Sequence, residues 1–170
     1  LVGPVGNNAL QAVGVATVIK NKKSNPLVLC SVGDGTSQQG EVLEAIAHAV
    51  RDNLPVLFVI EDNHWAISTK TFGKTFYNTP DGDADAFYGI PIVRVDGRNP
   101  EETFDTFGKV TAKIRADRKP AIVVFNVKRL NSHTNADDHR TYRNASEIDE
   151  TSKNNDPIPL LRSWLLGHGI

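Results

Sequence analysis

Two short apolar runs separated by a helical pattern constrain the fold of this 170-residue chain more than any other feature. The first run, residues 27–32, ends in Gly33-Asp34-Gly35, and the second, residues 55–60, ends in Glu61-Asp62-Asn63. Between them, residues 38–52 carry apolar side chains at helical spacing. Apolar runs of this length that alternate with helices predict buried strands of a parallel sheet. Their carboxyl ends would then meet at one edge of the sheet, where open α/β sheets bind ligands.

The Gly33-Asp34-Gly35 turn has the composition of a phosphate-binding site. Glycines let the backbone approach a ligand closely, and the free N–H groups of the helical turn after them attract anions. Asp34 adds a carboxylate, a ligand type that Mg²⁺ and Ca²⁺ prefer. The same three residues also occur as an ordinary turn without a ligand. Asn63 favours the binding site over an ordinary turn. At the end of a neighbouring parallel strand, it would lie where it could share one metal ion with Asp34.

The rest of the chain continues the alternation of helices and strands. We expect helices at residues 9–20, capped by Asn7 or Asn8, at residues 99–117, capped by Asn99, and from Asp156-Pro157 to Gly167. Further strands are predicted at residues 92–95 and 121–127, with a long loop at 68–85, a short helix at 84–88 and a second polar loop at 128–142. This order predicts one α/β domain over residues 1–170, with a doubly wound parallel sheet.

The composition is that of a globular domain and excludes several classes of protein. The net charge of −1 and the pI of about 6.6 indicate no nucleic-acid partner. No apolar run approaches the roughly 20 residues that span a bilayer, so no membrane partner is expected. The single cysteine, Cys30, falls in an expected buried strand and indicates a reducing compartment. The chain has no methionine and opens on an apolar, glycine-rich stretch, so we expect it to be a portion of a longer polypeptide.

Several blocks along the chain together resemble the alpha subunit of the first component of 2-oxo acid dehydrogenase complexes. The Gly-Asp-Gly turn and Asn63, separated by roughly two dozen residues, resemble the thiamine diphosphate motif, with Asp62 in place of its first asparagine. Transketolases and decarboxylases share that motif but are not expected to share the other blocks. These blocks are residues 11–14, Gly40-Glu41, residues 65–69, residues 88–91, residues 95–97, residues 129–134, Asp137-Asp138, Tyr142-Arg143 and residues 156–158.

The resemblance implies a three-layer thiamine diphosphate-binding fold in which Mg²⁺ accompanies the cofactor. It implies that Asp34 and Asn63 bind Mg²⁺ through side-chain oxygens and that Trp65 does so through its backbone carbonyl. It further implies that the backbone at Gly33, Gly35 and Thr36 binds the diphosphate.

The resemblance also assigns roles outside the glycine turn. His133 matches the active-site histidine, which contacts the diphosphate and moves protons, work that suits an imidazole near neutral pH. Arg129 is implied at the cofactor site and, with Tyr142 and Arg143, in ordering the loop that carries His133. Val5 occupies the place where the family packs an apolar side chain under the bent cofactor.

The activity implied by the resemblance is oxidative decarboxylation of a 2-oxo acid, with transfer of the acyl unit to a lipoyl group. The implied partners are a lipoyl acyltransferase component and a beta subunit, or a fused C-terminal half, that carries the pyrimidine-side domain. Without that domain the chain would be inactive. The expected location is the cytoplasm, or the mitochondrial matrix in a eukaryote.

Four residues depart from the family pattern and keep alternatives open. Asp62, Asn131 and Ser132 replace family residues, which leaves a non-catalytic cofactor-holding or assembly module of the same fold as an alternative. A transketolase-like enzyme is a third reading. Thr134 stands where mitochondrial members have a phosphorylatable serine, so control by a kinase is not expected.

Overall fold

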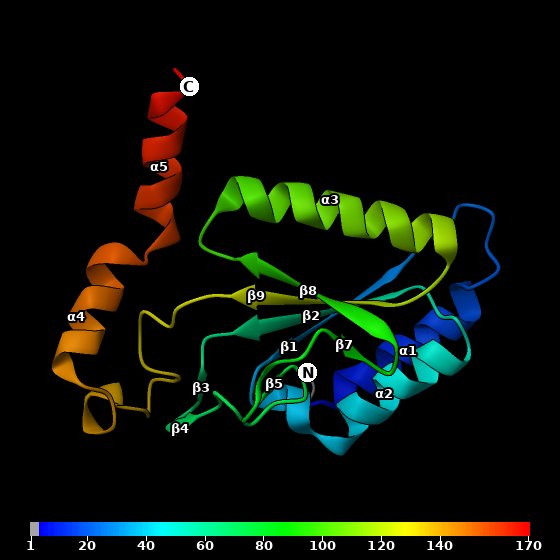
Figure 1. The fold of residues 1–170 in the computed structure, drawn as a ribbon, viewed down its shortest axis with the longest axis horizontal. Helices are drawn as coiled ribbons and strands as arrows, with labels where there is room; N and C mark the ends of the chain where they lie inside the picture. Colours follow the sequence, from blue (N-terminus) through cyan, green and yellow to red (C-terminus); the bar gives the residue numbers. More distant parts are fainter. Residues whose placement is uncertain (1–3) are drawn as a thin grey trace.

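The computed structural model describes residues 4–170 and has an α/β fold built on a five-stranded sheet (Figure 1). The strands lie in the order β1-β2-β9-β8-β7; the first four are parallel, and β7 pairs with β8 in the antiparallel direction. Their bounds are β1 (Val28–Gly33), β2 (Val56–Asp62), β9 (Ala121–Asn126), β8 (Ile90–Asp96) and β7 (Ala86–Phe87). Two short antiparallel pairs lie outside this sheet: β3 (Trp65–Ala66) with β4 (Thr69–Lys70), and β5 (Asn78–Thr79) with β6 (Gly82–Asp83).

Helices pack against both faces of the sheet because the two crossover connections run in opposite directions across it. Helix α2 (Gly40–Arg51) joins β1 to β2, and α3 (Pro100–Asp117) joins β8 back to β9. Since parallel crossovers are right-handed, reversing the direction places the second helix on the opposite face. Helix α1 (Asn7–Ile19) packs beside α2 (Figure 1).

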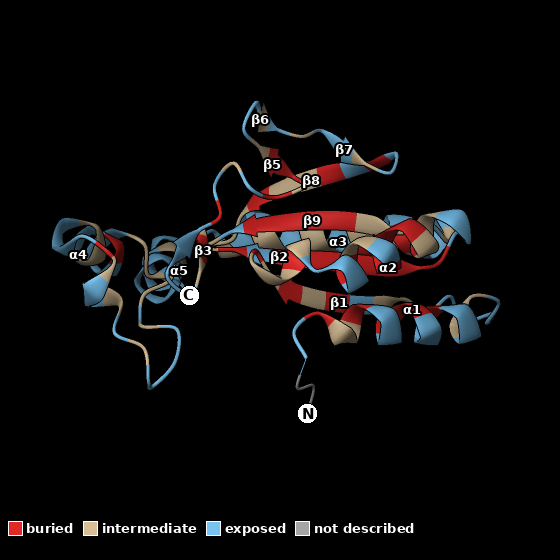
Figure 2. Ribbon diagram, turned by 90° about the horizontal axis from the view of Figure 1, so that it is seen from below, coloured by how far each residue is buried: buried red, intermediate tan, exposed pale blue. Residues whose placement is uncertain are grey.

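The alternation of side chains along β2 supplies both halves of the core. Phe58 and Ile60 belong to the apolar cluster that includes Ile46 of α2, whereas Leu57 and Val59 belong to the cluster that includes Ile114 of α3. This is the period of two expected of a strand covered on both sides. Figure 2 shows the burial concentrated in the strands and in the helix sides that face them.

The carboxyl ends of the four parallel strands lie at one edge of the sheet. The strand register pairs Gly33 with Glu61, Asp62 with Asn126, and Asp96 with Asn126. The prediction that the Gly-Asp-Gly turn and the Asp62-Asn63 segment follow neighbouring parallel strands is therefore confirmed. Among residues 4–170, no helix has both the length and the apolar character required to cross a membrane.

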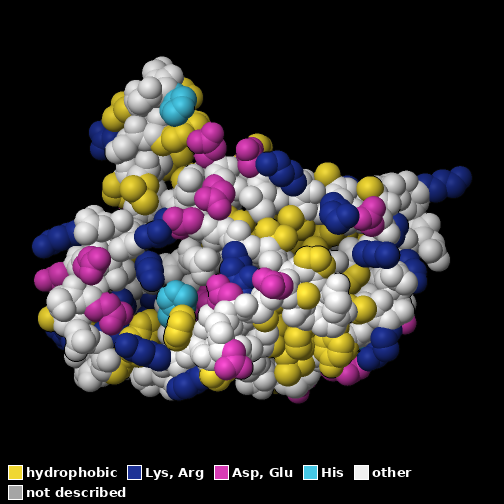
Figure 3. Space-filling model, in the orientation of Figure 1, with side chains coloured by type: hydrophobic (Ala, Val, Ile, Leu, Met, Phe, Trp, Pro, Cys, Tyr) yellow, Lys and Arg dark blue, Asp and Glu magenta, His cyan; other side chains and the backbone are white. Residues whose placement is uncertain are grey.

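The C-terminal part of the chain extends beyond this edge (Figure 1). It contains α4 (Ala145–Asn154) and α5 (Pro157–Gly167), and two 3₁₀ turns, η1 (Thr36–Gln38) and η2 (His139–Thr141), complete the helical elements. None of the residues in α5 is buried, and apolar side chains are visible on its surface in Figure 3. The Trp164 indole N–H ties α5 to the start of α3 by donating to Glu101 Oε2 at 2.9 Å.

The structure corrects four details expected from the sequence. The helix at 84–88 is wrong, because Tyr88 and Gly89 adopt positive φ and form the turn between β7 and β8. Neither asparagine caps α1, whose N-cap is Gly6; Asn8 instead donates to the Ser31 carbonyl on the outer edge of β1 at 3.0 Å. The sheet is mixed rather than wholly parallel, owing to β7, and α4 was not expected. The caps at Asn99 and Asp156 are confirmed.

Candidate functional site

The glycine turn packs tightly against the segment that follows β2. A Cβ atom added to Gly35 would lie 2.5 Å from the Ala66 Cβ, so only glycine fits there without displacing strand β3. The Ser37 hydroxyl closes the turn by donating to the Asp34 carbonyl at 2.6 Å. The turn then runs into η1, whose first residue, Thr36, presents the start of a helical turn. Gly33 has open space where a side chain would stand.

Asp34 is a buried carboxylate, with 2 % of its surface exposed. Its Oδ2 atom accepts a hydrogen bond from the Thr71 hydroxyl at 2.6 Å. Burial raises the pKa of Asp34 above its ordinary value; the Thr71 bond opposes this shift, and the nearby Asp62 carboxylate adds to it. The negative charge of Asp34 is therefore only partly compensated within the described chain.

Asp62 ends β2, Asn63 follows it, and both side chains accept hydrogen bonds from the turn that leads to β3. Asn63 Oδ1 accepts from the Trp65 backbone N–H at 3.0 Å, and Asp62 Oδ1 accepts from the His64 backbone N–H at 2.8 Å. The ring Nδ1 of His64 lies 3.1 Å from the same Asp62 oxygen. Burial alone would raise the pKa of Asp62, but the His64 ring and N–H hold it below its ordinary value. His64 thus compensates for the carboxylate that departs from the family pattern.

Trp65 connects this edge of the sheet to the loop that follows β9. The Arg129 guanidinium lies over the Trp65 ring, with 5.9 Å between Cζ and the ring centroid, and donates to the Ile67 carbonyl at 2.7 Å. On the other side, the Trp65 indole N–H donates to Glu147 Oε1 at 3.3 Å. Glu147 also accepts from Arg143 Nε at 2.9 Å.

The 128–142 loop is held by a chain of side-chain hydrogen bonds. Arg129 donates to the Tyr142 hydroxyl at 2.8 Å, Tyr142 donates to Asp137 Oδ2 at 2.6 Å, and the same oxygen accepts from the His133 backbone N–H at 2.8 Å. The Tyr142 and His133 donors hold the pKa of Asp137 below its ordinary value. Arg143, with 2 % of its side chain exposed, braces the loop by donating to the Arg129 carbonyl at 2.9 Å.

The structure brings some of the expected site residues together and leaves others apart. A cleft of about 480 Å³ has Asn63, Trp65, Arg129 and Arg143 among its lining residues. His133 is exposed, and its hydrogen bond to Asp137 is made by the backbone rather than by the ring. Its catalytic role stays a prediction.

Val5 lies in the turn before α1. Its side chain is 60 % exposed, and the adjacent Gly6 packs on Gln39 and Val42 at the start of α2. The contact of Val5 with the cofactor stays a prediction.

The residues at the carboxyl edge fit Mg²⁺ and a diphosphate. The buried Asp34 carboxylate, with one oxygen held by Thr71, is a charge that a bound cation would compensate. The Asn63 amide oxygen uses one lone pair on the Trp65 N–H and keeps a second for a metal. Hard oxygen donors of this kind are what Mg²⁺ prefers. Gly33 and Thr36 border the open side of the turn, where backbone N–H groups attract phosphate.

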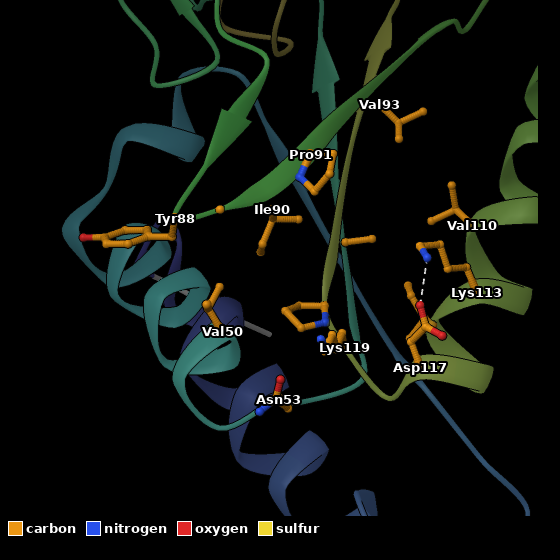
Figure 4. Close-up of a pocket in the computed structure, with 14 residues that line it drawn as sticks. Val50, Asn53, Tyr88, Ile90, Pro91, Val93, Val110, Lys113, Asp117 and Lys119 are labelled. Carbon is orange, nitrogen blue, oxygen red and sulfur yellow. Dashed lines mark hydrogen bonds and ion pairs between the residues drawn. The ribbon is translucent and has the colours of Figure 1, made fainter.

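A second pocket, at the opposite edge of the sheet, is apolar (Figure 4). It has a volume of about 390 Å³ and lies between α2, α3 and the amino ends of β8 and β9, with Val50, Ile90, Pro91 and Val110 in its walls. The Lys113 and Asp117 side chains at its border pair with each other at 2.8 Å. None of the expected site residues lines it.

Solved structures share the fold. Benzoylformate decarboxylase from Polynucleobacter necessarius aligns with 74 % of this chain and 24 % of its own, at 21 % identity and a TM-score of 0.51. A candidate thiamin diphosphate-dependent enzyme from Mycobacterium smegmatis aligns with 75 % of this chain and 23 % of its own, at 21 % identity and a TM-score of 0.52. These alignments show that the chain shares its α/β fold with a part of each of these two enzymes.

The family of the chain follows from its sequence. Residues 2–170 match the model of the dehydrogenase E1 component family, and the chain belongs to that family. It is 32 % identical over 167 residues to the 3-methyl-2-oxobutanoate dehydrogenase subunit alpha of Mycobacterium tuberculosis, covering 98 % of this chain and 45 % of the relative. It is 31 % identical over 166 residues to the pyruvate dehydrogenase E1 component subunit alpha of Staphylococcus aureus, with coverage of 98 % and 45 %. The human mitochondrial 2-oxoisovalerate dehydrogenase subunit alpha is 28 % identical over 166 residues, with coverage of 98 % and 37 %. The chain thus spans less than half the length of these relatives.

Three polar residues of the site had no expected role in the sequence. Thr71 lies in a loop without periodicity, 37 positions from the carboxylate it contacts, and no local signal identifies it. Glu147 belongs to a helix that was not expected. His64 could have been found, because an aspartate two residues before a histidine favours a local side-chain-to-backbone turn.

Proposed function

We propose that this chain is the diphosphate-binding part of a thiamine diphosphate-dependent 2-oxo acid dehydrogenase. The observation that carries the proposal is the buried Asp34 carboxylate beside the glycine turn, adjacent to the Asn63 segment, in a chain of the dehydrogenase E1 family. The three-layer organisation of the thiamine diphosphate-binding fold, over one domain spanning residues 1–170, is part of the proposal.

Most of the expected site residues of this chain bind and orient the cofactor, and His133 is the one proposed to move protons. Asp34 and Asn63 supply side-chain oxygens to Mg²⁺, and Trp65 supplies its backbone carbonyl. Backbone N–H groups at Gly33, Gly35 and Thr36 bind the diphosphate, to which the start of a helical turn is electrostatically suited. When bound, the cofactor supplies the carbanion-stabilising chemistry that decarboxylation of a 2-oxo acid requires.

The loop after β9 completes the site from the other side. The Arg129–Tyr142–Asp137 hydrogen bonds fix its conformation, and the loop presents the His133 imidazole to move protons. Arg129 adds positive charge on the Trp65 side of the cleft, and Val5 contacts the cofactor from the α1 side.

Partners follow from the names of the relatives, which are alpha subunits of dehydrogenases. We propose a beta subunit or a fused second half that completes the cofactor site, and a lipoyl acyltransferase component that accepts the acyl unit. The substrate is a 2-oxo acid, with 3-methyl-2-oxobutanoate and pyruvate as the first to test. The cytoplasm, or the mitochondrial matrix in a eukaryote, stays the predicted location.

Calorimetric titration of thiamine diphosphate with Mg²⁺ tests the proposal in the complete protein assembled with its partner. We expect binding in the wild type and its loss in Asp34→Ala and Asn63→Ala. The matched control is Asp81→Ala, which removes an exposed carboxylate far from the glycine turn in sequence. Absence of wild-type binding would overturn the proposal. Binding without decarboxylation of any 2-oxo acid would instead support the non-catalytic module, whereas the family match already disfavours a transketolase-like enzyme.

A further inference from the structure

Thr71 makes contacts with both strand ends that carry the expected metal ligands. Its hydroxyl donates to Asp34 Oδ2 at 2.6 Å, and its backbone N–H donates to the His64 carbonyl at 3.1 Å. Asp34 follows β1, and His64 directly follows Asn63 after β2. Thr71 is itself buried, with 7 % of its surface exposed. One residue of a distant loop therefore bridges the two halves of the proposed metal site.

The sheet alone does not fix the two expected ligands relative to each other. The register between β1 and β2 ends at the Gly33–Glu61 pair, so Asp34 and Asn63 both lie beyond the last paired residues. A side chain in a turn has rotational freedom that a metal site cannot tolerate, and partners outside the coordination shell normally remove it. Thr71 does this for Asp34 through the hydrogen bond from its hydroxyl to Oδ2.

The loop around Thr71 is built to hold it in place. The Thr71 carbonyl accepts from the Lys74 N–H at 2.9 Å, and the Gly73 N–H donates to Asn78 Oδ1 at 2.6 Å. The buried Asn78 is fixed in turn, because its N–H donates to the Thr75 hydroxyl at 2.9 Å and its amide to Asp83 Oδ1 at 2.6 Å. A β-branched side chain such as threonine also has few χ1 rotamers.

We infer that Thr71 is a positioning residue that fixes the orientation of the Asp34 carboxylate and holds it at a fixed separation from the segment that carries Asn63. The inference rests on the proposed function, since it concerns the same Mg²⁺ site. It adds that a residue outside the glycine turn sets the metal affinity.

The test uses Mn²⁺ in place of Mg²⁺, with thiamine diphosphate, bound to the complete protein and followed by electron paramagnetic resonance. Thr71→Val keeps the shape and removes the hydroxyl, so we expect Mn²⁺ affinity to fall by roughly 10-fold to 100-fold. Thr71→Ser keeps the hydroxyl, so its Mn²⁺ affinity is expected to stay within about 3-fold of the wild-type value. That is less than the loss expected from removing a partner outside the coordination shell. The control is Thr69→Val, an exposed threonine in the same hairpin, which should bind like the wild type.

A metal-free measurement separates this role from general destabilisation. Amide hydrogen exchange over residues 64–71 is expected to become faster in Thr71→Val than in Thr69→Val. Wild-type Mn²⁺ binding together with unchanged affinity in Thr71→Val would overturn the inference and leave the proposed function standing. Failure of Thr71→Ser to preserve binding, or an equal loss in Thr69→Val, would also overturn it. Absence of binding in the wild type would overturn both.

Discussion

Replacing Gly35 by alanine tests the packing between the glycine turn and the hairpin that follows β2. The added Cβ would lie 2.5 Å from the Ala66 Cβ and 3.3 Å from the Ala66 Cα. Carbon atoms in favourable contact are about 3.5–4.0 Å apart, so the hairpin must move by roughly 1 Å. Overpacking of this kind costs about 1–3 kcal/mol. The backbone adds no strain of its own, because Gly35 has φ −63° and ψ −40°, values that alanine also adopts. The lower entropy of an unfolded alanine then contributes about 0.4–1 kcal/mol in the opposite direction.

The expected net result is a decrease of about 1–2 kcal/mol in the free energy of unfolding, measured by urea denaturation. Gly40→Ala is the matched control, since nothing lies within 4 Å of its added Cβ. At the start of α2 that substitution should instead stabilise by up to about 1 kcal/mol. Adding Ala66→Gly to Gly35→Ala removes the clashing methyl group and should recover part of the loss. A Gly35→Ala protein as stable as the wild type, or no recovery in the double variant, would refute the packing argument.

Three further substitutions probe other contacts of the site and its frame. Tyr142→Phe removes the hydroxyl that donates to Asp137 and should lower the free energy of unfolding in urea by about 1 kcal/mol. It should also speed proteolysis of the 128–142 loop. The control Tyr88→Phe, whose ring is exposed, should have neither effect. Asn99→Ala removes the cap of α3 and should lower the free energy of unfolding by about 0.5–2 kcal/mol; no loss would show that the cap contributes nothing. Asp34→Asn tests the buried carboxylate, whose pKa is raised in the folded protein. In the metal-free wild type this group therefore contributes stability at a pH below the ordinary aspartate pKa. That contribution is lost as the pH rises through the folded-state pKa. The stability of Asp34→Asn relative to the wild type should therefore increase with pH, and a difference independent of pH would contradict the assignment.

The strand ends that form the site could be predicted because their signals are local. The apolar runs before Gly33 and Asp62 specify buried strands, and the helix between them makes the strands parallel neighbours. The order of the strands in the sheet is harder to predict from the sequence, because β9 lies between β2 and β8 although it comes later in the chain. The short helix expected at 84–88 failed for a different, local reason. Tyr88 and Gly89 both have positive φ and form a two-residue turn, so Phe87 pairs with Ile90 in a hairpin instead of continuing a helix.

Helix α4 shows why the loop side of the site was harder to predict than the sheet. Its sequence is mostly polar and only Thr151 of its residues is buried, so the helix has no apolar stripe from which it could be predicted. The helix is held instead by the contacts of Glu147 with Trp65 and Arg143. Trp65 lies 82 positions from Glu147 and Arg143 lies 4 positions from it. The contact with Trp65 cannot be predicted from the local sequence, because it forms only where the folded sheet positions Trp65.

This division between core and loops has a physical consequence for the site. The glycine turn and Asn63 lie directly at the ends of buried strands, where separation from the core would expose many apolar side chains to water. The segment that carries His133 is instead held mainly by polar contacts, each of which contributes about 1–3 kcal/mol net. Segments held in this way open more readily than the core they rest on. The glycine turn is therefore expected to stay ordered under conditions in which the loop that carries His133 already opens.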